Sequence, residues 1–177
     1  ILSAQFLSAG TERWKAMIAD ALLAATGCTR LYERSDSGVR QMEGLAPVKG
    51  WLRGDGATAV TLHEHDIRLS VDVEEGHKPA SYPARRENRA RCARRVPQAG
   101  GRSARNRYSY TSGFSVAALA GGATEVVSVD SSGPALARAS AHVELNGFNP
   151  AHHTTLDADV NATLRQMLKD GRQFDAI

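Results

Sequence analysis

The strongest constraint on the fold is the alternation of strand-like and helix-like segments from residue 103 to the end of the chain. The predicted helices carry their own boundary signals: Pro134 suits a first helical turn, and Gly147 and Gly171 suit helix ends. The predicted order is a strand ending at 108–110, helix 114–120, strand 125–129, helix 134–146, strand 154–156, a helix from 159 and a strand from 174. Strands and helices alternating at this spacing predict a parallel sheet with right-handed crossovers.

The first 76 residues predict a different, smaller α+β module. Thr11 can cap a helix that runs to Thr26, and Gly27 can end it. Apolar residues with helical spacing predict its buried face: Trp14, Met17, Ile18, Ala21, Leu22 and Ala25. Strands are predicted at 29–33, 48–52, 59–63 and 67–73, and the turn signals at 54–56 and 64–66 favour antiparallel hairpins.

The charge of the chain is unevenly distributed. Its net charge is +3, yet nine arginines lie between Arg85 and Arg107, opposed only by Glu87, and the remainder of the chain is acidic. Such a segment favours an anionic partner, nucleic acid above all, although a solvated basic loop would have the same composition. With no apolar run near the roughly 20 residues that span a bilayer, we expect a soluble, cytoplasmic protein without a membrane partner.

Two further groups of residues are candidates for metal or redox chemistry. Cys28 and Cys92 fit neither a disulfide framework nor a paired metal motif. The stretch His63-Glu64-His65-Asp66 places potential ligands close together, but a third ligand at suitable spacing is missing. We therefore interpret it as a turn or an exposed strand end and predict no metal site.

Polar residues follow the predicted parallel strands, at the edge where open α/β sheets bind ligands. The turn 108–114 joins the first strand to its helix, and Asp130 ends the next strand. Asp130 lies about 20 residues on, the spacing at which a carboxylate bonds ribose hydroxyls. Asp159, after the third strand, is placed to meet an adenine amine. Capping and turn chemistry stay open as the alternative, because the turn has one glycine and Asp130 can cap a helix.

The residues Asn106, Tyr108-Ser109-Tyr110-Thr111 and Gly113-Phe114-Ser115 together resemble the cofactor-binding first motif of class I S-adenosylmethionine-dependent RNA methyltransferases. The most similar group is that of the large-subunit ribosomal RNA cytosine-5 methyltransferases. Six further segments resemble this group, in the same order: 32–36, 43–45, 76–78, 86–89, 128–131 and 143–146.

The resemblance implies a fold and a division of the chain. The expected fold class is α/β, a Rossmann-like class I methyltransferase sheet represented by its first four strands and preceded by the small α+β module. The expected parts are the central module 1–76, an arginine-rich connecting segment with the first strand at 77–107, and the N-terminal half of the methyltransferase domain at 108–177. The chain is thus expected to be a fragment.

The resemblance also implies a cofactor, S-adenosylmethionine. Asp130 would hold its ribose, the loop from Ser109 to Gly113 would approach its methionine part, and Asp159 with Val160 would flank its adenine. The expected cofactor-binding residues are Asn106, Tyr108, Ser109, Thr111, Ser112, Gly113, Asp130, Ser131, Asp159 and Val160.

The implied reaction is methylation of ribosomal RNA, at cytosine C5 of the large-subunit RNA. The catalytic cysteine and the Asp-Pro-Pro motif are expected beyond Ile177, so this chain alone is predicted to be inactive. Ribosomal RNA is the expected partner, and a homodimer is compatible with the sequence.

The chain also departs from the family pattern. Ser112 replaces a glycine and is expected to crowd the cofactor, residues 79–81 and 84–85 differ, and the first strand contains Arg105 and Arg107. Charges in a central strand are unfavourable when unpaired. Two alternatives therefore stay open: an inactive RNA-binding fragment, and an NAD-dependent oxidoreductase, against which the missing glycine fingerprint counts.

Overall fold

The computed structural model describes residues 1–74, 85–98 and 100–176. The chain forms two compact units, Ile1–Val60 with Val71–Ala80 and Thr61–Ser70 with Ser81–Ile177. Strands β4 (Ala59–Glu64) and β5 (Ile67–Asp72) pair as a hairpin whose tip belongs to the second unit. The family-like segment 76–78 and the departures at 79–81 and 84 lie outside the described residues.

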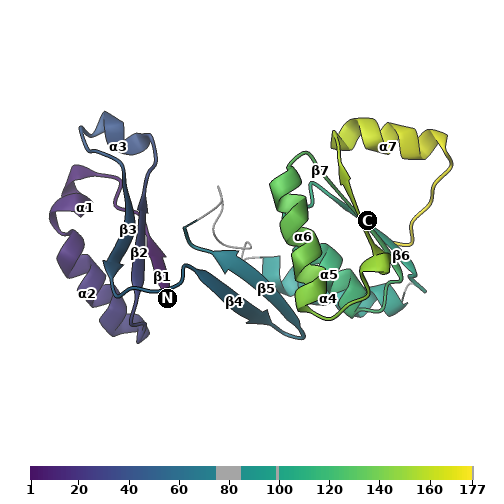
Figure 1. Ribbon diagram of the computed structural model, residues 1–177, viewed down its shortest axis with the longest axis horizontal. Coiled ribbons are helices and arrows are strands. Elements are labelled where there is room, and N and C mark those ends of the chain that lie inside the picture. Colours follow the sequence, from purple (N-terminus) through teal and green to yellow (C-terminus); the bar gives the residue numbers. More distant parts are fainter. Residues whose placement is uncertain (75–84, 99, 177) are drawn as a thin grey trace. The chain divides into compact units, whose positions relative to one another are not determined.

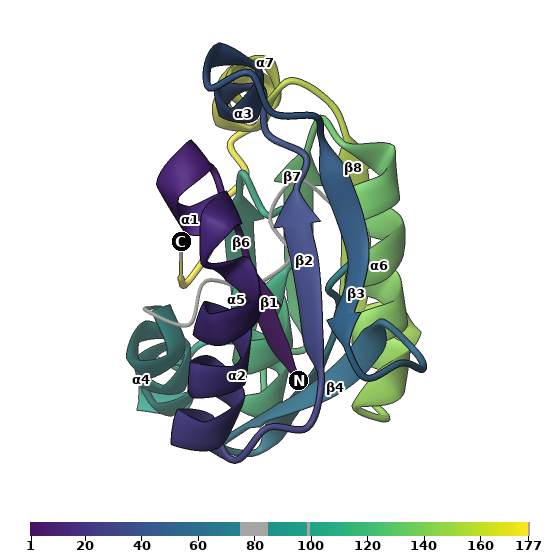
Figure 2. The ribbon, with the colours of Figure 1, turned by 90° about the vertical axis from the view of Figure 1, so that its left-hand side faces the viewer.

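The first unit is a three-stranded sheet with helices on one face. Its strands are β1 (Leu2–Ala4), β2 (Leu31–Ser35) and β3 (Val48–Arg53); β1 pairs parallel with β2, and β2 pairs antiparallel with β3. Helices α1 (Ala9–Arg13) and α2 (Lys15–Thr26) cover one face of this sheet, as Figures 1 and 2 show. A short helix, α3 (Val39–Met42), joins β2 to β3. Neither β1 nor α3 is predicted from the sequence.

The hairpin predicted across residues 54–56 is wrong, because β3 pairs with β2 whereas β4 pairs with β5. The loop between β3 and β4 instead encloses Arg30, whose Nη1 donates to the carbonyl oxygens of Asp55 at 3.3 Å and Ala57 at 3.5 Å. Gly54 has a φ of +69°, and a Cβ there would lie 2.8 Å from Cγ of Arg30. The glycine thus serves close packing on Arg30.

The helix predicted from Thr11 is divided at Trp14, which ends α1 and begins α2. The predicted buried face is wrong: the exposed fractions of Trp14 and Met17 are 53% and 60%. The side facing the sheet instead contains Ala19 and the largely buried Lys15. Lys15 forms ion pairs there with Glu12 and Glu33.

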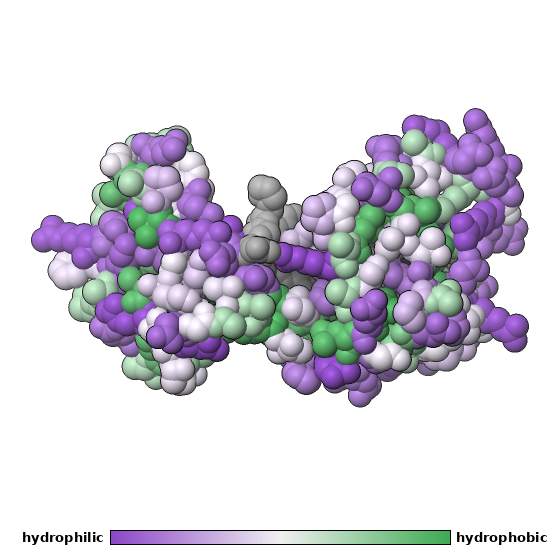
Figure 3. Space-filling model, viewed as in Figure 1, coloured by the Kyte–Doolittle hydropathy of each residue, from purple (hydrophilic) through white to green (hydrophobic). Residues whose placement is uncertain are grey.

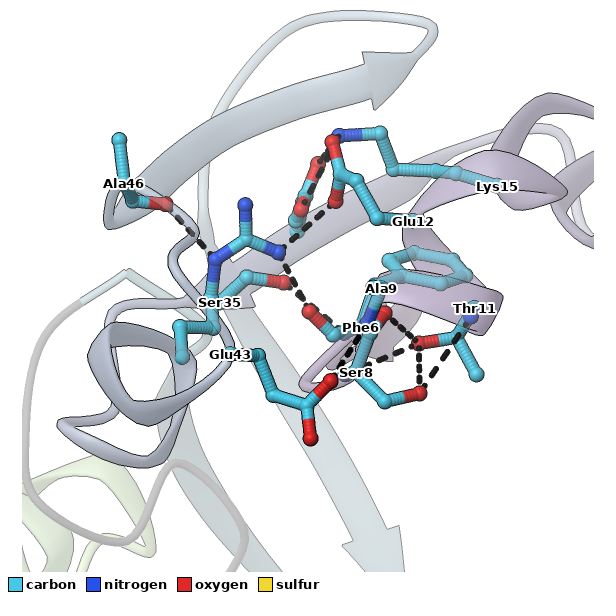
Figure 4. A network of polar contacts seen from close by, with 11 residues as sticks. Phe6, Ser8, Ala9, Thr11, Glu12, Lys15, Ser35, Glu43 and Ala46 are labelled. Atoms are coloured by element: carbon cyan, nitrogen blue, oxygen red, sulfur yellow. Dashed lines mark hydrogen bonds and ion pairs between the residues drawn. The ribbon is translucent and has the colours of Figure 1, made fainter.

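A buried guanidinium connects the elements of the first unit. Arg40 of α3 is 2% exposed. Its Nε donates to the carbonyl oxygen of Ala46 at 2.7 Å, and its Nη1 donates to the carbonyl oxygen of Phe6 and, at 2.8 Å, to Oε2 of Glu12. Lys15 Nζ donates to Oε1 of Glu12 at 2.7 Å (Figure 4). A buried charge is stable only when paired and hydrogen-bonded in this way.

The second unit is built on three parallel strands. The sheet order is β6 (Ser103–Arg107), β7 (Glu125–Asp130) and β8 (His153–Asp157). A parallel bridge from Ala104 to Ala176 places the C-terminal segment on the other edge of β6, with the nitrogen of Arg105 donating to the oxygen of Ala176 at 3.0 Å. The predicted parallel, Rossmann-like sheet is confirmed. Its helices are α4 (Arg86–Gln98), α5 (Gly113–Ala120), α6 (Gly133–Leu145), η2 (Pro150–His152) and α7 (Val160–Lys169).

Both faces of this sheet are covered. Val126 of β7 belongs to a core cluster shared with α4, α5 and α6, whereas Val127 and Val129 pack against Val160 and Met167 of α7. The outward surface in the region of α7 is largely hydrophilic (Figure 3). This alternation along β7 is expected of a parallel strand buried on both sides.

The two arginines of β6 are accommodated differently. Arg107 is exposed at the end of the strand, whereas Arg105 lies over the ring of Phe174, 4.9 Å from its centroid. Its Nη1 is 3.6 Å from Sδ of Met167. Burial and the nearby guanidinium groups of Arg107 and Arg172 lower the pKa of Arg105. The aromatic contact offsets part of the unfavourable burial.

Candidate functional site

The turn after β6 has an unusual backbone. Tyr108, Tyr110 and Ser112 have φ angles of 49°, 49° and 57°, a left-handed region that glycine adopts most easily. The nitrogen of Ser112 donates to the oxygen of Ser109 at 2.8 Å, which closes the turn. Left-handed backbone costs a non-glycine residue roughly 1–2 kcal/mol. Such strain concentrates at binding sites. The positions of glycines in the sequence do not reveal this turn, because tyrosine and serine adopt the glycine-like conformation here.

Asp130 lies against this turn. Its Oδ2 accepts a hydrogen bond from the nitrogen of Tyr110 at 2.8 Å, and its Oδ1 accepts one from the nitrogen of Ser132 at 3.0 Å. Of the alternative roles, helix capping is wrong, because Ser132 is the N-cap of α6 and accepts from the nitrogen of Ala135 at 3.4 Å, whereas turn chemistry is what the two bonds of Asp130 to backbone nitrogens show. The carboxylate therefore fixes the turn to the end of β7.

Ser109 carries an orphaned hydroxyl. The residue is 8% exposed, and among the described residues no group hydrogen-bonds to its buried Oγ. Its nitrogen donates to the oxygen of Val129 at 3.1 Å, which fixes it beside the end of β7. A buried hydroxyl without a partner costs about 1–3 kcal/mol. The turn therefore contains an unsatisfied polar group, which is rare in a folded core.

A chain of polar side chains lies beneath the turn. Asn106 Nδ2 donates to Ser115 Oγ at 3.0 Å, and Ser115 Oγ lies 2.7 Å from Ser128 Oγ. Ser128 Oγ also accepts from Ser112 Oγ at 3.0 Å and lies 2.8 Å from His153 Nε2. Burial lowers the pKa of His153. The fully buried Ser112 thus directs its hydroxyl into the core, and its effect on the cofactor stays a prediction.

Gly113 begins α5 where space is restricted. A Cβ at this position would lie 3.1 Å from Cδ of Arg89 in α4. Arg89 Nε and Nη2 donate to Oε2 and Oε1 of Glu64 in β4, at 2.8 and 2.7 Å, and both side chains are buried. Two-point carboxylate pairing holds a guanidinium in a fixed orientation. Glycine at 113 allows this ion pair to pack against the start of the helix.

His142 also positions the turn, and the sequence analysis missed it. This buried residue of α6 has its Nδ1 3.0 Å from the carbonyl oxygen of Thr111, and its Nε2 accepts from the nitrogen of Ser70 at 3.0 Å. The same Nε2 also lies 3.0 Å from the carbonyl oxygen of Ser70, so the ring contacts both backbone groups of that residue. The sequence signal that could have identified His142 is its position, as a polar residue on an otherwise apolar helix face, one turn before Asn146.

The remaining predicted residues contribute unequally. Asp159 is the N-cap of α7, and its Oδ1 accepts from the nitrogen of Ala162 at 2.7 Å. The side chain of Val160 is 3% exposed within the core, so the structure does not bring it to the site. Ser131 is exposed after Asp130. Tyr108 is exposed, and its Oη donates to Oδ1 of Asn161 at 3.4 Å.

A group of metal ligands and a membrane-spanning helix are both absent from the part of the chain that the structure describes. No group of three or more potential metal ligands is found there, and Glu64, part of the stretch 63–66, is bound to Arg89. No described helix is long and apolar enough to cross a membrane.

Comparison with known proteins decides the family. The S-adenosylmethionine-dependent methyltransferase family matches residues 41–175. The chain belongs to this family.

Among curated methyltransferases, the chain is 42% identical over 173 residues to "Ribosomal RNA large subunit methyltransferase I" of Alteromonas mediterranea, covering 98% of the chain and 43% of the relative. The protein of the same name from Pseudoalteromonas translucida is 41% identical over 178 residues, covering 100% of the chain and 44% of the relative. The chain thus spans less than half the length of either.

Solved methyltransferase structures share the fold. A protein from Streptococcus mutans, assigned as a SAM-dependent methyltransferase, has a TM-score of 0.80 with 24% identity over 97% of this chain and 43% of its own. Another structure in this comparison, with 23% identity, a TM-score of 0.80 and the same two coverages, is a complex with SAH. These similarities confirm the fold class.

Proposed function

We propose that this chain binds S-adenosylmethionine over the turn 108–112 and the end of β7. The observation that carries the proposal is the bond from the nitrogen of Tyr110 to Asp130, beside the orphaned hydroxyl of Ser109. Family membership supports it. When bound, the cofactor supplies a sulfonium methyl group that is already activated for transfer. The residues of the chain therefore only need to bind and orient it.

The proposed roles follow from what each group offers. Asp130 accepts hydrogen bonds from the ribose hydroxyls, because a carboxylate has more acceptor sites than its two backbone partners occupy. The loop from Ser109 to Gly113 approaches the methionine part. The free oxygen of Asp159 and the backbone of Val160 flank the adenine. Asn106 and Ser112 support the turn from the core side, through their hydrogen bonds to Ser115 and Ser128.

We propose large-subunit ribosomal RNA as the substrate, with cytosine C5 as the methyl acceptor, in the cytoplasm. Both named relatives carry the words "Ribosomal RNA large subunit methyltransferase". The chain covers 43% and 44% of them, which supports a division of labour. In this proposal residues 1–76 form a central module, residues 77–107 contain the arginine-rich connecting segment and the first strand, β6, and residues 108–177 supply the N-terminal half of the methyltransferase domain.

Arginines on α4 support an RNA partner. Arg86, Arg91, Arg94 and Arg95 are exposed on this helix, whereas Arg89 is buried. Exposed guanidinium groups bind phosphates and release counterions, so RNA affinity is expected to fall steeply with salt. Replacing Arg91 and Arg94 with glutamine should reduce that salt dependence. An unchanged slope would contradict the role of α4.

The test of cofactor binding is a calorimetric titration of the chain with S-adenosylhomocysteine, with NADH in parallel. We expect binding of the first ligand only, and Asp130→Ala should weaken it by roughly tenfold or more, the effect of losing hydrogen bonds to a charged group. Asp170→Ala, at the far end of α7, is the matched control. Absence of binding by the unaltered chain contradicts the proposal, and binding of NADH alone favours an oxidoreductase.

A further inference from the structure

The ring of Tyr108 is exposed at the edge of the sheet where the cofactor is proposed to bind. Its exposed fraction is 66%, and with Leu168 it is one of two large apolar or aromatic side chains exposed in the described part of the second unit. Tyrosine has a large flat face that gains from contact with another flat group. An exposed ring at this position therefore offers a contact surface to a ligand.

The hydroxyl of Tyr108 locates this ring. Its Oη donates to Oδ1 of Asn161 at 3.4 Å. Tyr108 follows β6 and Asn161 lies in the first turn of α7, after β8. Because β7 lies between these strands, the bond extends across the end of β7, where Asp130 is located. The aromatic ring and the carboxamide are thus joined to each other, and Asp130 ends the strand that lies between theirs.

Asn161 retains most of its hydrogen-bonding capacity. It is exposed, and among the described residues Tyr108 is its only side-chain partner. One lone pair of Oδ1 and both hydrogens of Nδ2 remain for a ligand. An asparagine carboxamide matches adenine, because its oxygen accepts from the N6 amine while its nitrogen donates to N7. The neighbouring Asp159 uses one carboxylate oxygen to cap α7.

We infer that Tyr108 and Asn161 recognise the base of the nucleoside: the Tyr108 ring stacks on the purine and the Asn161 carboxamide selects adenine. This inference rests on the proposed cofactor site and names its specificity residues. The hydroxyl of Tyr108 has a separate role, because its bond to Oδ1 fixes the orientation of the carboxamide. Hypoxanthine, which has an oxygen in place of the N6 amine, presents two acceptors and loses one of the two bonds.

The test compares S-adenosylhomocysteine with its deaminated form, S-inosylhomocysteine, by calorimetric titration. The unaltered chain should bind the adenosyl form roughly tenfold more tightly, the discrimination of a good two-point contact. Asn161→Ala should abolish this preference. Tyr108→Ala should weaken both ligands by about tenfold, as loss of a stacking ring does. Tyr108→Phe should retain the stacking but reduce the preference for adenine.

The outcomes separate the inference from the proposed function. If the unaltered chain does not bind S-adenosylhomocysteine, the proposed function fails, and the inference fails with it. If it binds, but Asn161→Ala keeps the full preference or Tyr108→Ala binds normally, only the inference is overturned. Leu168→Ala, an exposed change on α7, is the control and should retain both affinity and preference. Thermal unfolding of each variant identifies any that fails to fold, and Tyr108→Phe then provides the test of the hydroxyl.

Discussion

Asn146 pairs with both backbone groups of Arg68: its Oδ1 accepts from the nitrogen and its Nδ2 donates to the oxygen, each at 2.7 Å. One helical turn earlier, His142 accepts from the nitrogen of Ser70. Residues four apart on α6 thus bind residues two apart on β5, because side chains four apart share a helix face and alternate residues of a strand direct their backbone groups to the same edge. Side chains of α6 therefore form the hydrogen bonds to this edge of β5 that a neighbouring strand would otherwise form.

Replacing Asn146 with alanine should therefore loosen β5 from α6. Three hydrogen bonds are lost, two to Arg68 and one to the oxygen of His142, and we expect the free energy of unfolding to fall by about 1–3 kcal/mol in urea titrations. Asn146→Asp is the matched control for the donor, because it keeps an acceptor for the nitrogen of Arg68 but loses the bond to its oxygen. Hydrogen exchange at the Arg68 amide should accelerate in the alanine variant. An unchanged rate would contradict the docking role.

The buried pair of Arg89 and Glu64 should be the most sensitive to substitution. Glu64→Gln leaves a buried guanidinium without its counter-charge, and we expect a loss of about 3–5 kcal/mol in the free energy of unfolding. Glu87→Gln provides the contrast: its side chain is 70% exposed and 3.8 Å from His65, so the change should stay within about 0.5 kcal/mol. Equal effects of the two changes would show that burial of the pair does not matter.

The first unit should lose stability in acid through Glu12. Hydrogen bonds from Lys15 and then Arg40 lower the pKa of Glu12 below its ordinary value of 4.5. A lowered folded pKa means that the stabilisation is fully present above pH 4.5 and is lost as the pH falls through the lower value. Urea titrations from pH 7 down to about pH 3 should show a steeper loss for the unaltered chain than for Glu12→Gln. Parallel curves would exclude this group.

Ser128 should matter more than its size suggests, because three other polar side chains beneath the turn bond to its hydroxyl. Ser128→Ala removes the partner of Ser112, Ser115 and His153 together, with an expected loss of about 1–3 kcal/mol. Ser140→Ala, which removes only a bond to the oxygen of Leu136 within α6, is the comparison. Thermal unfolding followed by circular dichroism measures both. A smaller effect at Ser128 than at Ser140 would rule out the network.

The order of elements in the second unit was predictable from local signals. Proline at the start of α6 and glycine after α6 and α7 mark helix boundaries with little help from the rest of the fold. The placement of Asp130 at the turn was also predictable, since carboxyl ends of parallel strands meet at one edge. Its roles toward a ligand stay predictions.

What the sequence analysis missed depends on distant contacts. Asn146 and His142 bind residues 78 and 72 positions away, and no local pattern contains that information. The strand β1 has only three residues and exists because β2 pairs with it. Trp14 was assigned to the core because apolar spacing ignores the ion pairs that Lys15 forms. The left-handed turn was missed because Tyr108, Tyr110 and Ser112 are not glycines.

The bond between Tyr110 and Asp130 has a consequence for binding kinetics. The strained turn is already held in shape by groups of the chain itself, so a nucleoside arriving there meets a preorganised surface. The conformational entropy of that loop is lost during folding and not during association. Ligand capture should therefore proceed in one kinetic step, limited by encounter rather than by rearrangement of the loop.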